Sequence, residues 1–211
     1  MRRVAIYMIL MILAISLIGC GAGPKISMVS QGNKTGVFSE IKEEAPIPKG
    51  FSGLVIKAHI KTHLEGYSIF EPKGSPHGKP EYPFLLNIDG QVVIWNAKGA
   101  KEITPKYDKW GRITPEGGEG MRYELSKKIR LHPGRHAVSF VLPAEEYMEN
   151  VDITSEEGKT HILEFKPIYN IDVTTYKTQP RIPLRNFMYE FREYDGFLDG
   201  NPISYWSFLG F

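Results

Sequence analysis

Short stretches in which apolar and polar residues alternate are the feature of this 211-residue chain that most restricts its fold. The clearest spans residues 54–62, where Leu54, Ile56 and Ile60 would share one face of a strand. Alternation returns in residues 123–131, 136–142, 151–154 and 160–165, and glycine or proline residues separate several of these stretches. No long helical period accompanies them. The pattern therefore predicts an all-β fold of six or seven short strands, arranged as an antiparallel β-sandwich.

Two local signals refine this expectation. Asp89-Gly90 lies between β-rich runs at 84–88 and 91–95, and both residues tolerate the positive φ that a tight hairpin needs. Residues 96–121 are instead rich in glycine and charge, which predicts an irregular excursion longer than an ordinary loop.

The segments Leu131-His132-Pro133-Gly134-Arg135-His136 and Ile88-Asp89-Gly90 carry a family resemblance. They are similar to the corner and hairpin motifs of PEGA and related carbohydrate-binding-like or transthyretin-like sandwiches, over at most residues 54–167. The resemblance implies an immunoglobulin-like β-sandwich that binds or supports other molecules. It implies no catalytic residues.

The amino-terminal segment has the features of a secretory leader. Arg2 and Arg3 precede an apolar run from Val4 to Ile18, which only Ser16 interrupts. The run is shorter than the ~20 residues that a membrane-spanning helix needs, so we expect a signal peptide over residues 1–19 that is cleaved from the mature protein.

The run ends in Leu17-Ile18-Gly19-Cys20, which resembles the lipobox of bacterial lipoproteins. The resemblance implies that Cys20 receives a diacylglycerol and then acyl chains such as palmitate, which would hold the protein on a bilayer. The alternative is an uncleaved amphiphilic anchor whose cysteine happens to stand at its end. Gly21 occupies the position where an aspartate would retain such a lipoprotein at the inner membrane, which favours the outer membrane, facing the periplasm or the cell surface.

Composition divides the rest of the chain into three parts. Residues 20–50 are rich in glycine, proline and charge and predict a flexible tether. Residues 51–167 contain the predicted sandwich, and residues 168–211 form an aromatic-rich carboxy-terminal extension.

Several functions find no support in the sequence. Beyond Arg2 and Arg3, 24 basic residues balance 24 acidic residues, so no overall charge favours nucleic acid. No Gly-x-Ser-x-Gly elbow or phosphate-binding loop is present. Glu145 and Glu146, or Asp195 and Asp199, would be candidate acid–base pairs, but their spacing is not specific.

The histidines also lack a metal-binding spacing. Lys57, His59, Lys61 and His63 would share one strand face, where alternate side chains stand ~6.6 Å apart, and a solvated sheet face explains them better than chelation. His132 and His136 flank a Pro-Gly turn, whereas His77 and His161 stand alone. The only cysteine is assigned to the lipid. We therefore expect no metal site and no cofactor other than the covalent lipid.

The carboxy-terminal extension concentrates aromatic residues. The candidate partner-binding residues are Phe187, Tyr189, Phe191, Tyr205 and Trp206, since aromatic side chains together with arginine are typical of interface anchors. The first three alternate, so we expect them to be buried together or exposed together. An edge strand and a tail packed on the sandwich is the simpler interpretation of these residues, which we prefer, and partner binding is the more specific hypothesis.

The sequence thus favours a membrane-anchored lipoprotein that acts as a cell-envelope binding or scaffolding module. Its expected partners are the bilayer, through the acyl chains, and an envelope protein or polysaccharide. The alternative is an envelope enzyme such as a glycan hydrolase, which would need two carboxylates converging in a cleft.

Overall fold

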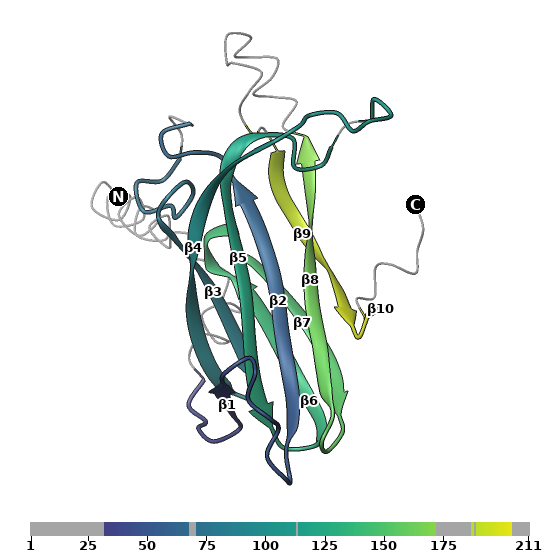
Figure 1. The fold of residues 1–211 in the computed structure, drawn as a ribbon. Coiled ribbons are helices and arrows are strands. Elements are labelled where there is room, and N and C mark those ends of the chain that lie inside the picture. The colour runs from purple at the N-terminus through teal and green to yellow at the C-terminus, as the bar shows by residue number, and fades with distance from the viewer. Residues whose placement is uncertain (1–31, 68–70, 113, 172–186, 188, 204–211) are drawn as a thin grey trace, which may run out of the picture.

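The computed structural model describes residues 32–67, 71–112, 114–171, 187 and 189–203, and the regular secondary structure of these ranges is β-strand apart from one short 3₁₀ turn (Figure 1). The strands are β1 (Phe38–Ile41), β2 (Ser52–Thr62), β3 (Glu81–Ile88), β4 (Gln91–Thr104), β5 (Gly118–Leu131), β6 (Gly134–Leu142), β7 (Tyr147–Ser155), β8 (Thr160–Ile171), β9 (Tyr189–Leu198) and β10 (Asn201–Pro202). One 3₁₀ turn, η1 (Pro143–Glu145), joins β6 to β7. Within these ranges no helix is long and apolar enough to cross a membrane. The predicted signal peptide and Cys20 lie outside the described residues.

The strands form one curled sheet in the order β10-β9-β8-β2-β5-β4-β3-β6-β7, and β1 pairs with β5 outside this path. Neighbouring strands are antiparallel except β2 and β8, which are parallel. The all-β prediction is confirmed for this part of the chain. The sheet is mixed, however, and not antiparallel throughout as the sandwich prediction required.

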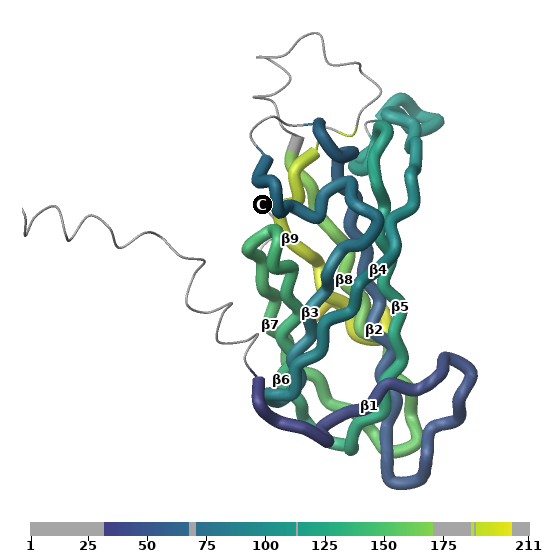
Figure 2. Tube along the Cα trace, turned by 90° about the vertical axis from the view of Figure 1, so that its left-hand side faces the viewer, coloured from purple at the N-terminus to yellow at the C-terminus, as the bar shows by residue number. Residues whose placement is uncertain are grey.

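The sheet curls because β4 belongs to two layers. Its first half pairs with β3 up to Lys98, and its second half, from Gly99 to Thr104, pairs with β5. A Cβ atom on Gly99 would lie 2.7 Å from the Tyr123 ring, so the close approach at this crossing requires glycine. The turned view shows the β3–β6–β7 part of the sheet lying across from β2 and β8 (Figure 2).

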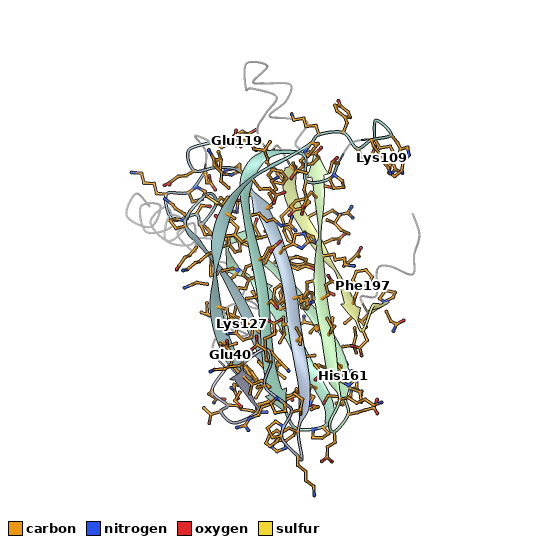
Figure 3. The ribbon with its side chains drawn as sticks, in the orientation of Figure 1. Glu40, Lys109, Glu119, Lys127, His161 and Phe197 are labelled. Atoms are coloured by element: carbon orange, nitrogen blue, oxygen red, sulfur yellow. The ribbon has the colours of Figure 1, made fainter. Side chains whose placement is uncertain are left out.

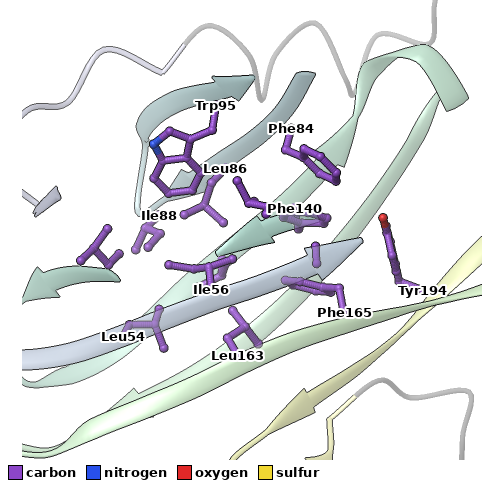
Figure 4. Packing of buried hydrophobic residues seen from close by; sticks show 14 of the residues in the cluster. Leu54, Ile56, Phe84, Leu86, Ile88, Trp95, Phe140, Leu163, Phe165 and Tyr194 are labelled. Atoms are coloured by element: carbon purple, nitrogen blue, oxygen red, sulfur yellow. The ribbon is translucent and has the colours of Figure 1, made fainter. Parts of the chain in front are cut away.

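The core fills the space between these two parts of the sheet (Figure 4). Leu54, Ile56 and Ile60 of β2 are fully buried, as their alternation predicts. Phe140 of β6 and Phe165 of β8 stack across the core with ring centroids 4.2 Å apart. The core therefore joins strands that are distant in the sequence.

The predicted tether differs from the structure after residue 31. Residues 38–41 form β1, and Phe38 is only 7% exposed. The carboxylate of Glu40 accepts a hydrogen bond from Trp95 Nε1 (3.1 Å) and pairs with Lys127 (2.7 Å; Figure 3). This segment therefore packs on the sheet, because it contributes a core side chain, Phe38, and pairs with β5.

Two other boundaries also change. β8 runs past the boundary predicted at residue 167, and β9 of the predicted extension pairs with it throughout its length. The predicted excursion shrinks to residues 105–117, because β4 continues to Thr104 and β5 begins at Gly118. The hairpin at Asp89-Gly90 is confirmed, with φ angles of 50° and 94°.

The strand directions define two ends of the sheet. At the β1 end lie β1, the Asp89-Gly90 turn and the first described residues, where the backbone N–H of Lys34 donates to the carbonyl of Gly90 (3.2 Å). At the opposite end, which we call the loop end, lie residues 63–67, 71–80, 105–112 and 114–117, together with η1 (Figure 1). β4 and β5 have 14 residues each, and at a rise of about 3.3 Å per residue the two ends stand about 45 Å apart.

Candidate functional site

A cluster of two histidines and two glutamates occupies the loop end. His63, Glu71 and His77 belong to the β2–β3 loop, and Glu145 comes from η1. The carboxylate of Glu71 lies 2.8 Å from His77 Nδ1 and 3.3 Å from His63 Nε2. The two ring nitrogens are 3.4 Å apart, so one carboxylate and two imidazoles meet around a single point.

The second nitrogen of each imidazole contacts an acceptor, which determines where its proton lies. His77 Nε2 contacts the Glu145 carboxylate at 2.6 Å, and His63 Nδ1 contacts the carbonyl of Leu64 at 2.9 Å. Since a carboxylate and a carbonyl only accept, both nitrogens must be N–H donors. His63 Nε2 and His77 Nδ1 face the Glu71 carboxylate, and in the neutral imidazoles these two nitrogens carry the lone pairs; without a cation between them, the 2.8 Å contact of His77 Nδ1 with Glu71 is that of an N–H donor on a protonated ring. We refer to His63, Glu71 and His77 as the three-donor cluster.

Glu145 lies behind His77 and is nearly enclosed. Burial opposes its charged form, but hydrogen bonds from His77 and from the Tyr82 hydroxyl (2.6 Å) outweigh burial and lower its pKa. Burial likewise disfavours charge on His77, but Glu145 and Glu71 together raise the pKa of that imidazole. Glu145 is therefore a charged acceptor that orients the His77 ring.

Backbone contacts hold the β2–β3 loop in this conformation. Gly78 has a φ of 68°, and a Cβ atom there would lie 2.0 Å from the backbone nitrogen of Glu65, so only glycine allows the two parts of the loop to touch. The Gly78 N–H donates to Thr62 Oγ1 (3.1 Å), and the Tyr123 hydroxyl donates to the carbonyl of Lys79 (2.7 Å). The cluster thus rests on a backbone fixed against β2 and β5.

A second ionic cluster fastens the β4–β5 loop to the sheet. Glu116 accepts from His59 (3.0 Å) and from Arg122 (2.6 Å). Burial opposes the charge, but these partners outweigh it and lower the pKa of Glu116 to about 2. Lys61, predicted on a solvated face, is only 1% exposed because this loop covers it. Its ammonium donates to Thr104 Oγ1 and to the carbonyls of Glu116 and Gly118 at 2.8–3.0 Å.

The tip of the β4–β5 loop projects from the loop end (Figure 3). Trp110 is 68% exposed and Tyr107 is 62% exposed. Lys109 Nζ and Arg112 Cζ lie 4.2 and 4.8 Å from the centroid of the Trp110 ring. Asp108 accepts from the backbone N–H groups of Trp110 and Arg112, which orders the turn. An aromatic side chain is therefore presented to solvent on an ordered turn between two cations.

The predicted aromatic site does not form an exposed stripe where the structure describes it. Phe187 is only 1% exposed, whereas Tyr189 and Phe191 are half-buried. Arg192 forms a bulge in β9, because Phe191 pairs with Tyr169 whereas Glu193 pairs with Ile168. The bulge reverses the alternation, so that Tyr194 also points inward and is 2% exposed. The other two predicted residues, Tyr205 and Trp206, lie outside the described part of the chain.

The remaining candidates are separated. Glu145 belongs to the histidine cluster, whereas Glu146 turns away in a left-handed conformation with φ of 51°. His136 and His161 each pair with an aspartate at the β1 end, Asp89 and Asp199, at 2.7 Å. Of the carboxylates that the sequence offered as pairs, Glu145 contacts His77 and Asp199 contacts His161, whereas Asp195 lies within β9 opposite Lys166.

Sequence reasoning missed the three-donor cluster. It placed His63 on the face of a strand and His77 alone, but β2 ends at Thr62, so His63 belongs to the loop. The available signal was the pair of histidines around Glu71 in one connection rich in turn residues. Comparison of the chain with protein-family models, with curated proteins and with solved structures finds no match.

Proposed function

We propose that this protein is a lipid-anchored lipoprotein of the bacterial cell envelope whose β domain binds another envelope component. The observation that carries the proposal is the position of the only cysteine, Cys20, directly after the apolar run and within a lipobox-like Leu-Ile-Gly-Cys sequence. Two or more acyl chains on such a cysteine bind a bilayer durably. An outer-membrane location and a PEGA-like role in binding belong to the same proposal.

The positions of the β1 end and the loop end of the domain support this arrangement. The described chain begins at the β1 end, so a tether from Cys20 would reach the domain there. The loop end, with Trp110 and the three-donor cluster, would then face away from the anchoring bilayer by about the 45 Å length of the long strands. A binding surface at that end would be accessible to a partner.

The exposed tip favours a protein as the partner. Tryptophan, tyrosine and arginine are the residues most enriched at the energetic centres of protein interfaces. Here Arg112 lies over the Trp110 ring, and Tyr107 is exposed on the same loop. The ordered turn reduces the entropy that binding would cost. Binding is favoured over glycan hydrolysis, because Glu71 and Glu145 both contact His77 and are not a converging acid–base pair.

Replacing Cys20 with serine tests the anchor. Cys20→Ser is expected to abolish incorporation of labelled palmitate and to leave the protein either unprocessed or released from the membrane fraction, because a serine hydroxyl cannot replace the thiolate. Metabolic labelling and membrane fractionation measure this. A Cys20→Ser protein that still takes up the label would contradict the lipoprotein assignment.

Replacing Trp110 with alanine tests the tip. Trp110→Ala is expected to weaken partner capture by about tenfold or more, with the thermal midpoint unchanged within a few degrees, because the side chain supports interface contacts but little of the core. Ile94→Ala is the matched control, since Ile94 is also exposed, at 58%, but lies on the sheet away from the tip. The measurement is capture from detergent-solubilised envelope by the full-length protein. Equal capture by wild type and Trp110→Ala would exclude the tip, and capture that survives protease treatment of the envelope would exclude a protein partner.

A further inference from the structure

In the three-donor cluster, electron-pair donor atoms face one another, and a cation between them would stabilise this arrangement. With their other nitrogens donating to Leu64 and Glu145, the neutral forms of His63 and His77 direct the lone pairs of Nε2 and Nδ1 toward each other and toward the Glu71 carboxylate. Three acceptors facing one another repel unless a positive charge lies among them. The candidates for that charge are an added proton and a metal ion.

We propose that His63, Glu71 and His77 bind one divalent transition-metal ion, of which zinc is the best fit. At metal–ligand distances of 2.0–2.2 Å, the ligand atoms of a tetrahedral zinc site stand about 3.3–3.5 Å apart. The two observed separations at His63 Nε2, 3.3 Å to Glu71 and 3.4 Å to His77, have this length. The 3.3 Å separation is to Oε2 of Glu71, whereas Oε1 lies 2.8 Å from His77 Nδ1, so coordination through one oxygen needs a small rotation and outward shift of the carboxylate.

The groups around the cluster are those that support metal ligands. A ligating histidine ordinarily donates its other N–H to a carboxylate or a carbonyl, which fixes its tautomer and raises its basicity. His77 has the carboxylate of Glu145 and His63 has the carbonyl of Leu64 in these roles. Glu145 in turn accepts from Tyr82, and Glu71 accepts from Ser75 Oγ (2.6 Å). Each ligand is thus oriented by a partner of its own.

The charge of the cluster and its exposure to solvent both suit a divalent ion. A bound divalent ion would replace the proton between His77 and Glu71, and the charges of Glu71 and Glu145 would then balance its two positive charges, with both imidazoles neutral. The side chains of His63, Glu71 and His77 retain 18%, 14% and 21% exposure, which leaves a route from solvent. Imidazole ligands favour zinc and its transition-metal neighbours, whereas calcium and magnesium prefer oxygen ligands only. Three protein ligands leave one tetrahedral position for a water molecule or for a group of a bound partner.

Metal binding by the purified full-length protein in detergent tests the proposal. After treatment with a chelator, equilibrium dialysis against zinc is expected to give one tightly bound ion per chain, and magnesium is expected not to compete. His63→Gln, Glu71→Gln and His77→Gln should each lower zinc affinity about 100-fold or more, and Glu145→Gln about 10- to 100-fold. His161→Gln is the matched control, because His161 is a comparably buried histidine paired with a carboxylate at the other end of the sheet.

Two further measurements separate metal binding from folding. Cobalt(II) bound to the wild-type protein should show the intense visible absorption of a tetrahedral site, and zinc should displace it. Melting curves of the metal-free variants identify any variant that fails to fold. If a ligand variant does not fold, the zinc affinity of Glu145→Gln and the cobalt spectrum of the wild type test metal binding instead. A wild type that binds no zinc, or His77→Gln with wild-type affinity, would overturn the proposal and assign the positive charge to a proton on His77. The result is independent of the lipid anchor, because the lipoprotein proposal fails only in the palmitate experiment.

Discussion

A chain that ends at Pro180 is expected to lose cooperative unfolding altogether. The truncation removes Phe187 and β9, and with β9 it removes Tyr194, which is 2% exposed in the core. The Tyr194 hydroxyl donates to the carbonyl of His59 (2.8 Å), and its ring contacts Phe140 and Phe165. Each buried aromatic side chain contributes ~3–5 kcal/mol against a total stability of ~5–15 kcal/mol, so the loss of several exceeds what the domain can tolerate.

Thermal unfolding followed by circular dichroism measures this effect. The matched control is a chain that ends at Ile203, which keeps every described strand and should keep the midpoint of the full-length protein. A Pro180 truncation that melts at the same temperature as this control would show that the extension is dispensable for folding. The core contacts of β9 would then contribute little to stability.

Replacing Glu116 with glutamine is expected to destabilise the protein by about 2 kcal/mol at neutral pH. Burial opposes the charge of Glu116, but His59 and Arg122 lower its pKa from 4.5 to about 2. That difference corresponds to at most about 3 kcal/mol, and we expect less because the carboxylate keeps part of its contact with water. Since the folded pKa is depressed, this stabilisation is present above about pH 4.5 and is lost as the pH falls toward 2.

Urea unfolding between pH 7 and pH 2 measures the prediction. The wild-type free energy of unfolding should fall more steeply below pH 4.5 than that of Glu116→Gln, so the two curves should converge in acid. Glu124→Gln is the matched control, because Glu124 contacts the same arginine, Arg122, but is 70% exposed. A constant gap between wild type and Glu116→Gln across this range would contradict the depressed pKa.

The local pattern of the sequence predicts most of the strands and one turn. Leu54, Ile56 and Ile60 are buried as alternation requires, and Asp89-Gly90 turns where two β-rich runs meet. The second half of β4 and the first residues of β5 were not predicted as long strands, because this stretch is rich in glycine and charge and carries no sustained alternation of apolar residues. β1 was also missed, because four residues within a polar segment carry too short a pattern.

For the candidate sites too, the local sequence pattern predicted some features and missed others. The period of two predicted that Phe187, Tyr189 and Phe191 share a face, but the bulge at Arg192 then adds Tyr194 to the inward side. The histidine cluster depends on where a loop folds back, because His63, His77 and Glu145 meet only through the conformation around Gly78 and the position of η1. No spacing along the chain contains that information.

By itself, the sequence of residues 54–165 determined that the chain forms strands, where most of them lie and which face of each is apolar, because alternation is a property of neighbouring residues. Only the tertiary structure decided that β2 pairs in parallel with β8, that β4 joins two layers and that β1 belongs to the sheet. It also decided between the two interpretations of the extension, because β9 is a strand paired with β8. Strand pairing and loop closure depend on contacts between residues far apart in the chain. Their free energy is set by the packing of the whole core, not by any local pattern.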